Sequence, residues 1–137
     1  MSKLERPMRV TVLGSTGSIG SNTLDVMGRH PDRFEVYALA ASRQVDMLLA
    51  QCVHFQPRFA VMAQADAARE LADKLKAQGL RTQVLTGSDA MDRIASDPDV
   101  DAVMAAIVGA AGLSPCLAAA RAGKRLLLAN KEALVVG

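Results

Sequence analysis

Three glycines spaced three residues apart, Gly14, Gly17 and Gly20, lie between an apolar run and a stretch of helical character. The apolar run covers residues 10–13 and the helical stretch covers residues 21–29. A strand, a glycine-rich turn and a helix start, in this order, bring the backbone close to a phosphate, and the helix N-terminus offers unpaired N–H groups. Three hydroxyl side chains are expected to add donors for such an anion: Ser15, Thr16 and Ser18. The segment predicts a dinucleotide-binding loop, and the alternative is a tight turn that binds nothing.

The composition indicates one globular domain of 137 residues. Hydrophobic residues make up 50% of the chain, which argues against disorder. Aromatic residues make up only 3% and tryptophan is absent, so we expect an aliphatic, alanine-rich core.

Charge and cysteine usage exclude several classes of protein. The formal net charge is +2 and the basic residues are dispersed, which argues against a nucleic-acid partner. The longest apolar run, residues 102–113, is too short to span a bilayer. Cys52 and Cys116 lack the spacing of a metal site and are expected to be buried, reduced thiols. We therefore expect a cytoplasmic protein with neither a membrane nor a nucleic-acid partner.

Strand-like and helix-like segments alternate along the whole chain. Strands are expected over residues 8–13, 34–40, 59–62, 83–85, 100–108 and 125–128. Helices are expected over residues 19–29, 45–55, 67–75, 89–96 and 113–122, and Gly79 is expected to end the third helix. This alternation predicts an α/β, Rossmann-like fold, in which a doubly wound, mainly parallel sheet carries helices on both faces.

The residues after the second predicted strand indicate which dinucleotide is bound. NAD-specific domains carry an acidic residue there, which holds the ribose 2′-hydroxyl. This chain has Ser42, Arg43 and Gln44 instead. Because an arginine can pair with a 2′-phosphate, we expect a preference for NADP, and the alternative is a solvated surface arginine.

Two further strand ends carry residues of interest. Asn130, Lys131 and Glu132 follow the last predicted strand and either project into a ligand cleft or form an ordinary polar loop. Residues 106–112 are rich in small side chains, which allow either the approach of a flat ring or close helix–sheet packing. No Ser/His/Asp or Cys/His set is evident, so we predict no catalytic residue.

Three stretches together resemble 1-deoxy-D-xylulose 5-phosphate reductoisomerase. They are LGSTGSIG at residues 13–20, MAAIVGAAGL at residues 104–113 and LANKE at residues 128–132. Smaller matches occur at residues 23–26 and 121–124. The resemblance covers nearly the whole chain from Met8 onward.

The resemblance implies an activity and its cofactors. The family isomerises 1-deoxy-D-xylulose 5-phosphate and reduces the product with NADPH to 2-C-methyl-D-erythritol 4-phosphate, in non-mevalonate isoprenoid biosynthesis. Its partner is thus a small phosphosugar substrate, whose oxygens are held by Mg²⁺ or Mn²⁺. The full-length family members are usually homodimers.

The same resemblance implies roles for particular positions. The cofactor diphosphate would be cradled by Thr16, Gly17, Ser18 and Ile19. The adenosine 2′-phosphate would be surrounded by Ser42, Arg43 and Gln44. The nicotinamide side would be lined by Asn130 and Glu132, and the substrate would be contacted by Lys131.

The chain departs from the family pattern in two places. Family members often have Gly-Lys-Asn or Gly-Arg-Asn where this chain has Ser42, Arg43 and Gln44, so the charge is kept while a glycine, on which the backbone path can depend, is replaced. The sequence stops at Gly137, before the catalytic domain that supplies the metal ligands in the family. Residues 1–137 are therefore expected to be a single NADPH-binding domain, with no metal ligand, no catalytic residue and no turnover of its own.

Two other functions fit the same loop. One is the cofactor domain of another NADPH-dependent dehydrogenase, such as a semialdehyde dehydrogenase, which needs a nucleophilic cysteine. Cys52 and Cys116 lie in helix-like segments, which argues against that role. The other is a non-enzymatic nucleotide-binding domain.

Overall fold

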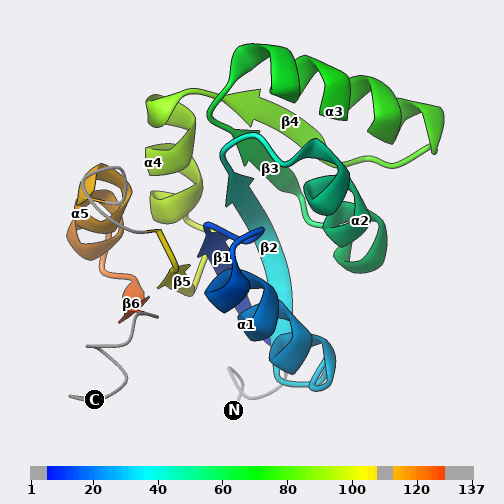
Figure 1. Ribbon diagram of the computed structural model, residues 1–137. Helices are drawn as coiled ribbons and strands as arrows, with labels where there is room; N and C mark the ends of the chain where they lie inside the picture. Colours follow the sequence, from blue (N-terminus) through cyan, green and yellow to red (C-terminus); the bar gives the residue numbers. More distant parts are fainter. Residues whose placement is uncertain (1–5, 108–112, 129–137) are drawn as a thin grey trace.

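The computed structural model of the chain describes residues 6–107 and 113–128. They form one sheet of parallel strands in the order β4-β3-β2-β1-β5-β6 (Figure 1). The strands are β1 (Met8–Leu13), β2 (Phe34–Ala41), β3 (Phe59–Met62), β4 (Gln83–Thr86), β5 (Ala102–Ala105) and β6 (Arg125–Leu128). The helices between them are α1 (Ser18–Gly28), α2 (Val45–Phe55), α3 (Ala65–Ala77), α4 (Ser88–Ser96) and α5 (Leu113–Arg121).

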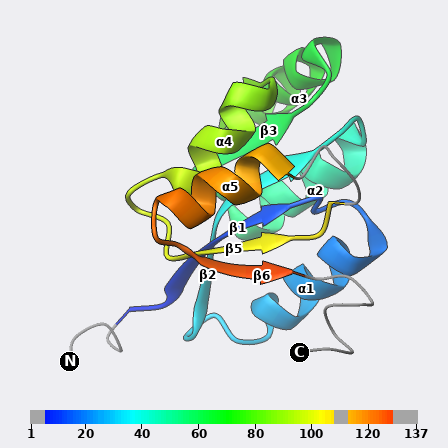
Figure 2. The same ribbon diagram turned by 90° about the vertical axis from the view of Figure 1, so that its left-hand side faces the viewer.

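The helices cover both faces of the sheet, as the alternation of segments predicts. Buried residues of α1, α2 and α3 pack together with one set of strand side chains, which includes Val12 and Met62. Buried residues of α4 and α5 pack with the other set, which includes Leu13 and Val61. The ribbons of α4 and α5 lie side by side (Figure 2). Neighbouring residues of a strand thus face opposite helix layers, and this explains why the central strands are apolar at nearly every position.

β1 lies at the point where the direction of winding reverses. The chain runs outward from β1 through β2 and β3 to β4, and then crosses back to place β5 on the other side of β1. At the carboxyl end of β1, Leu13 is paired with Ala40 of β2 and with Ala105 of β5. In open α/β sheets, ligands bind outside the carboxyl ends of the strands at this kind of switch point.

The structure agrees with one predicted element end and differs at one predicted strand. Gly79 has a φ of +72°, and the amide of Leu80 donates to the carbonyl of Leu75 at 3.0 Å, which ends α3 as predicted. β5 is shorter than the strand expected over residues 100–108: it begins only at Ala102, because the amide of Val100 donates to the Asp97 carbonyl in the preceding turn, and it ends at Ala105. Within the described ranges, no helix has the length and apolarity needed to cross a membrane.

The turn from β1 to α1 is tightly packed at Gly20 but not at Gly17. We therefore predict that a side chain is tolerated at Gly17 and not at Gly20. A Cβ on Gly20 would overlap the carbonyl oxygen of Gly14, whereas a Cβ on Gly17 would lie at an ordinary 3.6 Å from that atom. Gly20→Ala should lower the free energy of unfolding by about 1–3 kcal/mol, and Gly17→Ala should change it by less than about 1 kcal/mol. Urea unfolding of both variants measures the difference, and equal stabilities would contradict this packing.

Candidate functional site at the carboxyl edge of the sheet

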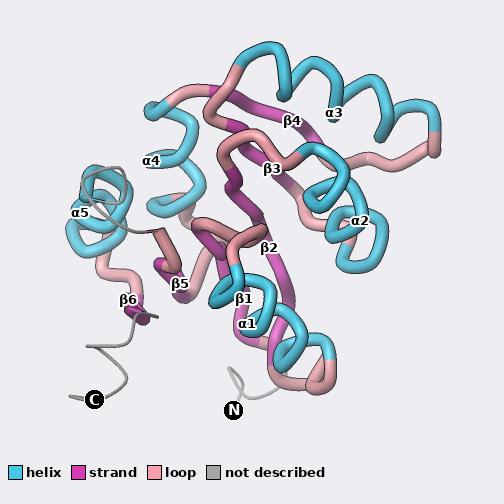
Figure 3. Tube along the Cα trace, viewed as in Figure 1, coloured by secondary structure: helices cyan, strands magenta, loops and turns pink. Residues whose placement is uncertain are grey.

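The glycine loop is joined to both strands that flank β1. The amides of Gly14 and Ser15 both donate to the carbonyl of Ala40 in β2, at 2.8 and 3.0 Å. On the other side, the amide of Ala106 donates to the carbonyl of Leu13 at 2.8 Å. The loop is therefore held at the switch point, between the segments that follow β2 and β5 (Figure 3).

The three glycines of the loop meet different constraints. Gly14 has a φ of +79°, and a Cβ there would lie 2.7 Å from the carbonyl oxygen of Ala106. Gly20 lies directly against the carbonyl of Gly14. Gly17 is exposed and has a φ of −73°, a conformation open to any residue. Within the described residues, neither the backbone conformation nor the packing requires a glycine at position 17.

The start of α1 offers unpaired amides at this edge. Gly17 is the N-cap residue, and the first helical bond runs from the amide of Ser21 to the carbonyl of Gly17 at 2.8 Å. Within residues 6–107 and 113–128, no acceptor pairs with the amides of Thr16, Ser18 or Ile19. The first turn carries no acidic side chain that would repel an anion. These donors and the positive end of the helix dipole suit the diphosphate of a dinucleotide.

Ser15 does not belong to this set of donors. Its side chain is completely buried, and its Oγ has no partner in the described part of the chain. Its backbone carbonyl accepts hydrogen bonds from Nε2 of Gln51 at 2.8 Å and from Oγ of Ser21 at 3.2 Å. The expectation that the Ser15 hydroxyl donates to a ligand is therefore wrong, because the backbone turn that seats the loop on β2 directs this residue inward.

The segment of Ser42, Arg43 and Gln44 leaves β2 beside the glycine loop. All three residues are exposed, and they come directly after the strand end that holds Gly14 and Ser15. Arg43 makes no ion pair with any described residue. Its guanidinium charge is thus available to an anion.

The carboxylates of Asp66 and Glu70 lie close to Arg43, which the sequence pattern does not predict. A cavity of about 360 Å³ is lined by Arg43, Val45, Gln64, Asp66, Ala67 and Glu70. Glu70 pairs with Nζ of Lys74 at 3.0 Å, and Oδ1 of Asp66 accepts the amide of Ala67 at 2.9 Å. Neither carboxylate forms an ion pair with Arg43 within the described part of the chain.

The remaining predicted positions lie partly outside the described residues. Asn130, Lys131 and Glu132 are not described, and the strand before them, β6, ends at Leu128 at the same edge of the sheet. Of the small-residue segment 106–112, only Ala106 and Ile107 are described. Ile107 packs against the core between the sheet and α4 and α5, which favours the packing interpretation for that residue.

Neither cysteine has the character of a catalytic nucleophile. Cys52 is buried in α2, and burial raises the pKa of its thiol to about 12. Cys116 is only partly buried, contrary to expectation, and desolvation raises the pKa of its thiol as well. A reactive cysteine needs a lowered pKa, so neither thiol suits a semialdehyde dehydrogenase. Among the described side chains, no group of three His, Cys, Asp or Glu residues could hold a metal ion.

Comparison with known proteins identifies the family. The family described as 1-deoxy-D-xylulose 5-phosphate reductoisomerase matches residues 10–137. The chain belongs to this family. The reductoisomerase of Aromatoleum aromaticum is 63% identical over 131 residues, which are 96% of this chain and 32% of that protein. The chain thus spans about a third of the length of the curated relatives it matches.

Solved reductoisomerase structures have the same fold. A crystal structure of the enzyme in complex with NADPH, fosmidomycin and magnesium matches with a TM-score of 0.86 and 48% identity, over 93% of this chain and 31% of that one. The Zymomonas mobilis enzyme in complex with NADPH matches with a TM-score of 0.84 and 43% identity, over 95% of this chain and 34% of that one. These matches confirm the doubly wound α/β architecture predicted for this reductoisomerase-family chain.

Proposed function

We propose that residues 1–137 form the NADPH-binding domain of a 1-deoxy-D-xylulose 5-phosphate reductoisomerase. The observation that carries this proposal is the row of amides at Thr16, Ser18 and Ile19 that have no acceptor among the described residues, at the switch point of the sheet. The solved relatives that contain NADPH support the choice of cofactor. The whole enzyme would isomerise its phosphosugar substrate and reduce the product to 2-C-methyl-D-erythritol 4-phosphate.

In this proposal the glycine loop and the segment after β2 bind different parts of the cofactor. The amides of residues 16–19 bind the diphosphate, and Gly17 leaves the space for its close approach. Arg43, flanked by Ser42 and Gln44, binds the adenosine 2′-phosphate. Asn130 and Glu132 would lie on the nicotinamide side and Lys131 would contact the substrate, as the family resemblance implies. NADPH supplies the hydride when it is bound.

We propose no role for the described residues in chemistry on the substrate itself. Among the described residues, no group of three His, Cys, Asp or Glu side chains could hold Mg²⁺ or Mn²⁺. Their proposed work is to bind and orient the coenzyme. The free thiols of Cys52 and Cys116 support a reducing compartment such as the cytoplasm.

The proposal predicts that a side chain at position 17 blocks cofactor binding without unfolding the protein. Gly17→Val would place methyl groups where the diphosphate approaches, while its backbone conformation and the 3.6 Å distance to the Gly14 oxygen tolerate a Cβ. Fluorescence titration should show loss of NADPH binding, with a thermal unfolding midpoint close to that of the unaltered chain. Ala77→Val, at an exposed position near the end of α3, is the matched control and should bind normally. Normal binding by Gly17→Val would mean that the loop is only a turn.

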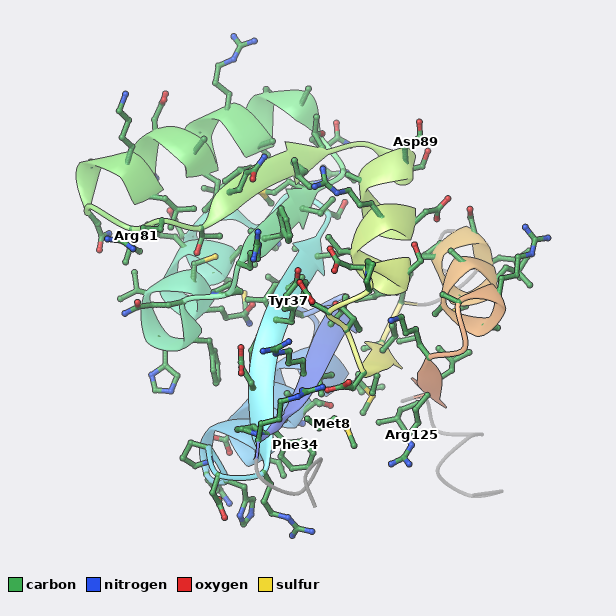
Figure 4. All side chains as sticks on the ribbon, turned by 180° about the vertical axis from the view of Figure 1, so that it is seen from behind. Met8, Phe34, Tyr37, Arg81, Asp89 and Arg125 are labelled. Atoms are coloured by element: carbon green, nitrogen blue, oxygen red, sulfur yellow. The ribbon has the colours of Figure 1, made fainter. Side chains whose placement is uncertain are left out.

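A second prediction concerns the choice between NADPH and NADH. Arg43→Ala should weaken NADPH binding by about 1.5–3 kcal/mol, the range for a hydrogen bond to a charged group, and leave NADH binding unchanged. Arg81→Ala removes the same charge from the turn between α3 and β4, at the opposite edge of the sheet, and should affect neither coenzyme (Figure 4). Calorimetric titration with both coenzymes measures the effect. Equal affinity of the unaltered chain for NADPH and NADH would overturn the role given to Arg43.

A further inference from the structure

The carbonyl group of Ser15 is held by side chains from two different helices. Nε2 of Gln51, on α2, donates to it at 2.8 Å across 36 residues of sequence. Oγ of Ser21, in α1, donates to the same oxygen at 3.2 Å. The orientation of this carbonyl is therefore set by the helices behind the loop.

The orientation of the Ser15 carbonyl also determines the orientation of the Thr16 amide. A trans peptide is planar, so its N–H points opposite to its C=O. The described residues include no cis peptide, and the N–H of Thr16 accordingly points away from Gln51 and Ser21. This N–H is one of the amides without an acceptor in the described structure. Gln51 thus determines the direction of a donor in the proposed diphosphate site, although its own side chain lies behind that site.

Backbone hydrogen bonds hold the neighbouring peptide groups of the loop but not this one. The amides of Gly14 and Ser15 bond to Ala40, and the amide of Gly17 bonds to the carbonyl of Gly14 at 3.3 Å. In the described chain, the peptide group between Ser15 and Thr16 receives hydrogen bonds only from the side chains of Gln51 and Ser21. Removing these donors leaves that group free to reorient.

A second observation concerns the other end of the Gln51 carboxamide. Its Oε1 is buried and has no hydrogen-bond partner among the described atoms. A buried acceptor without a partner lowers stability, and such groups call for an explanation. Here the explanation is that only the donor end of the carboxamide is used, to orient the loop.

We infer that Gln51 is a positioning residue for the dinucleotide diphosphate, which it serves by holding the Ser15–Thr16 peptide group in its binding orientation. The inference rests on the proposed function. Gln51 acts on the diphosphate site, which NADPH and NADH share, and among the described hydrogen bonds its side chain makes none to the 2′-phosphate segment of Ser42, Arg43 and Gln44. Its loss therefore weakens the binding of both coenzymes by the same factor, whereas loss of Arg43 weakens the binding of only one.

The test is Gln51→Met, which keeps the length of the side chain and removes the donor. Titration should show affinities for NADPH and NADH that are both about 3- to 10-fold lower, with their ratio unchanged, because one neutral hydrogen bond contributes about that much. The stability to urea should stay the same or rise, since the unpartnered Oε1 is removed as well. Gln78→Met, at the exposed end of α3, is the matched control and should bind as the unaltered chain does.

The outcomes separate this inference from the proposed function. If the unaltered chain binds NADPH and Gln51→Met binds it equally well, Gln51 has no positioning role and the proposed function stands. If the unaltered chain binds neither coenzyme, the proposed function fails, and the inference fails with it. A changed NADPH-to-NADH ratio in Gln51→Met would place its effect at the segment before α2 and would also overturn the inference.

A direct measurement follows the Thr16 amide itself. In the unaltered, ¹⁵N-labelled chain its NMR resonance should shift when NADPH is added, and the shift should be smaller in Gln51→Met. Ser21→Ala removes the longer of the two hydrogen bonds and should give a smaller loss of affinity with the same unchanged ratio. This second variant keeps the inference testable if Gln51→Met does not fold. A Thr16 resonance that does not respond to NADPH would contradict the inference.

Discussion

The carbonyl oxygen of Ala40 accepts hydrogen bonds from the amides of both Gly14 and Ser15, and the rest of the site depends on this junction. It joins the loop after β1 to the end of β2, so the start of α1 and the residues around Arg43 lie next to each other. Each hydrogen bond contributes only about 0.5–1.5 kcal/mol to stability, but together the two bonds determine the position of the loop against the end of β2. The switch point then places the free amides outside the sheet, where a ligand can reach them.

The spacing of the glycines follows from this junction. Gly14 turns the chain with a positive φ against the backbone of Ala106, and Gly20 lets α1 start directly against the Gly14 carbonyl. These two glycines allow the tight turn, while Gly17 places no side chain on the exposed surface of the loop. Helix α2, behind the loop, adds a further contact, because Gln51 donates to the Ser15–Thr16 peptide group, for which the described residues offer no backbone partner.

Most of the fold could be predicted from the sequence, because apolar runs, helical periodicity and the end signal at Gly79 are local features. The loop and Arg43 could be identified for the same reason. The inward direction of Ser15 could not, since it depends on a bond to Ala40 that forms only in the folded sheet. The positions of Gln51 behind the loop and of Asp66 and Glu70 beside Arg43 were also missed, because these residues come from helices that the topology brings there.

The central claim is that the backbone amides of the first loop bind the diphosphate of NADPH. A crystal structure of this chain grown with NADPH tests it most directly. We predict diphosphate oxygens within hydrogen-bonding distance of the amides of Thr16, Ser18 and Ile19, with the 2′-phosphate at the guanidinium group of Arg43. A coenzyme bound elsewhere on the chain, or an empty loop at a saturating concentration of NADPH, would contradict the account.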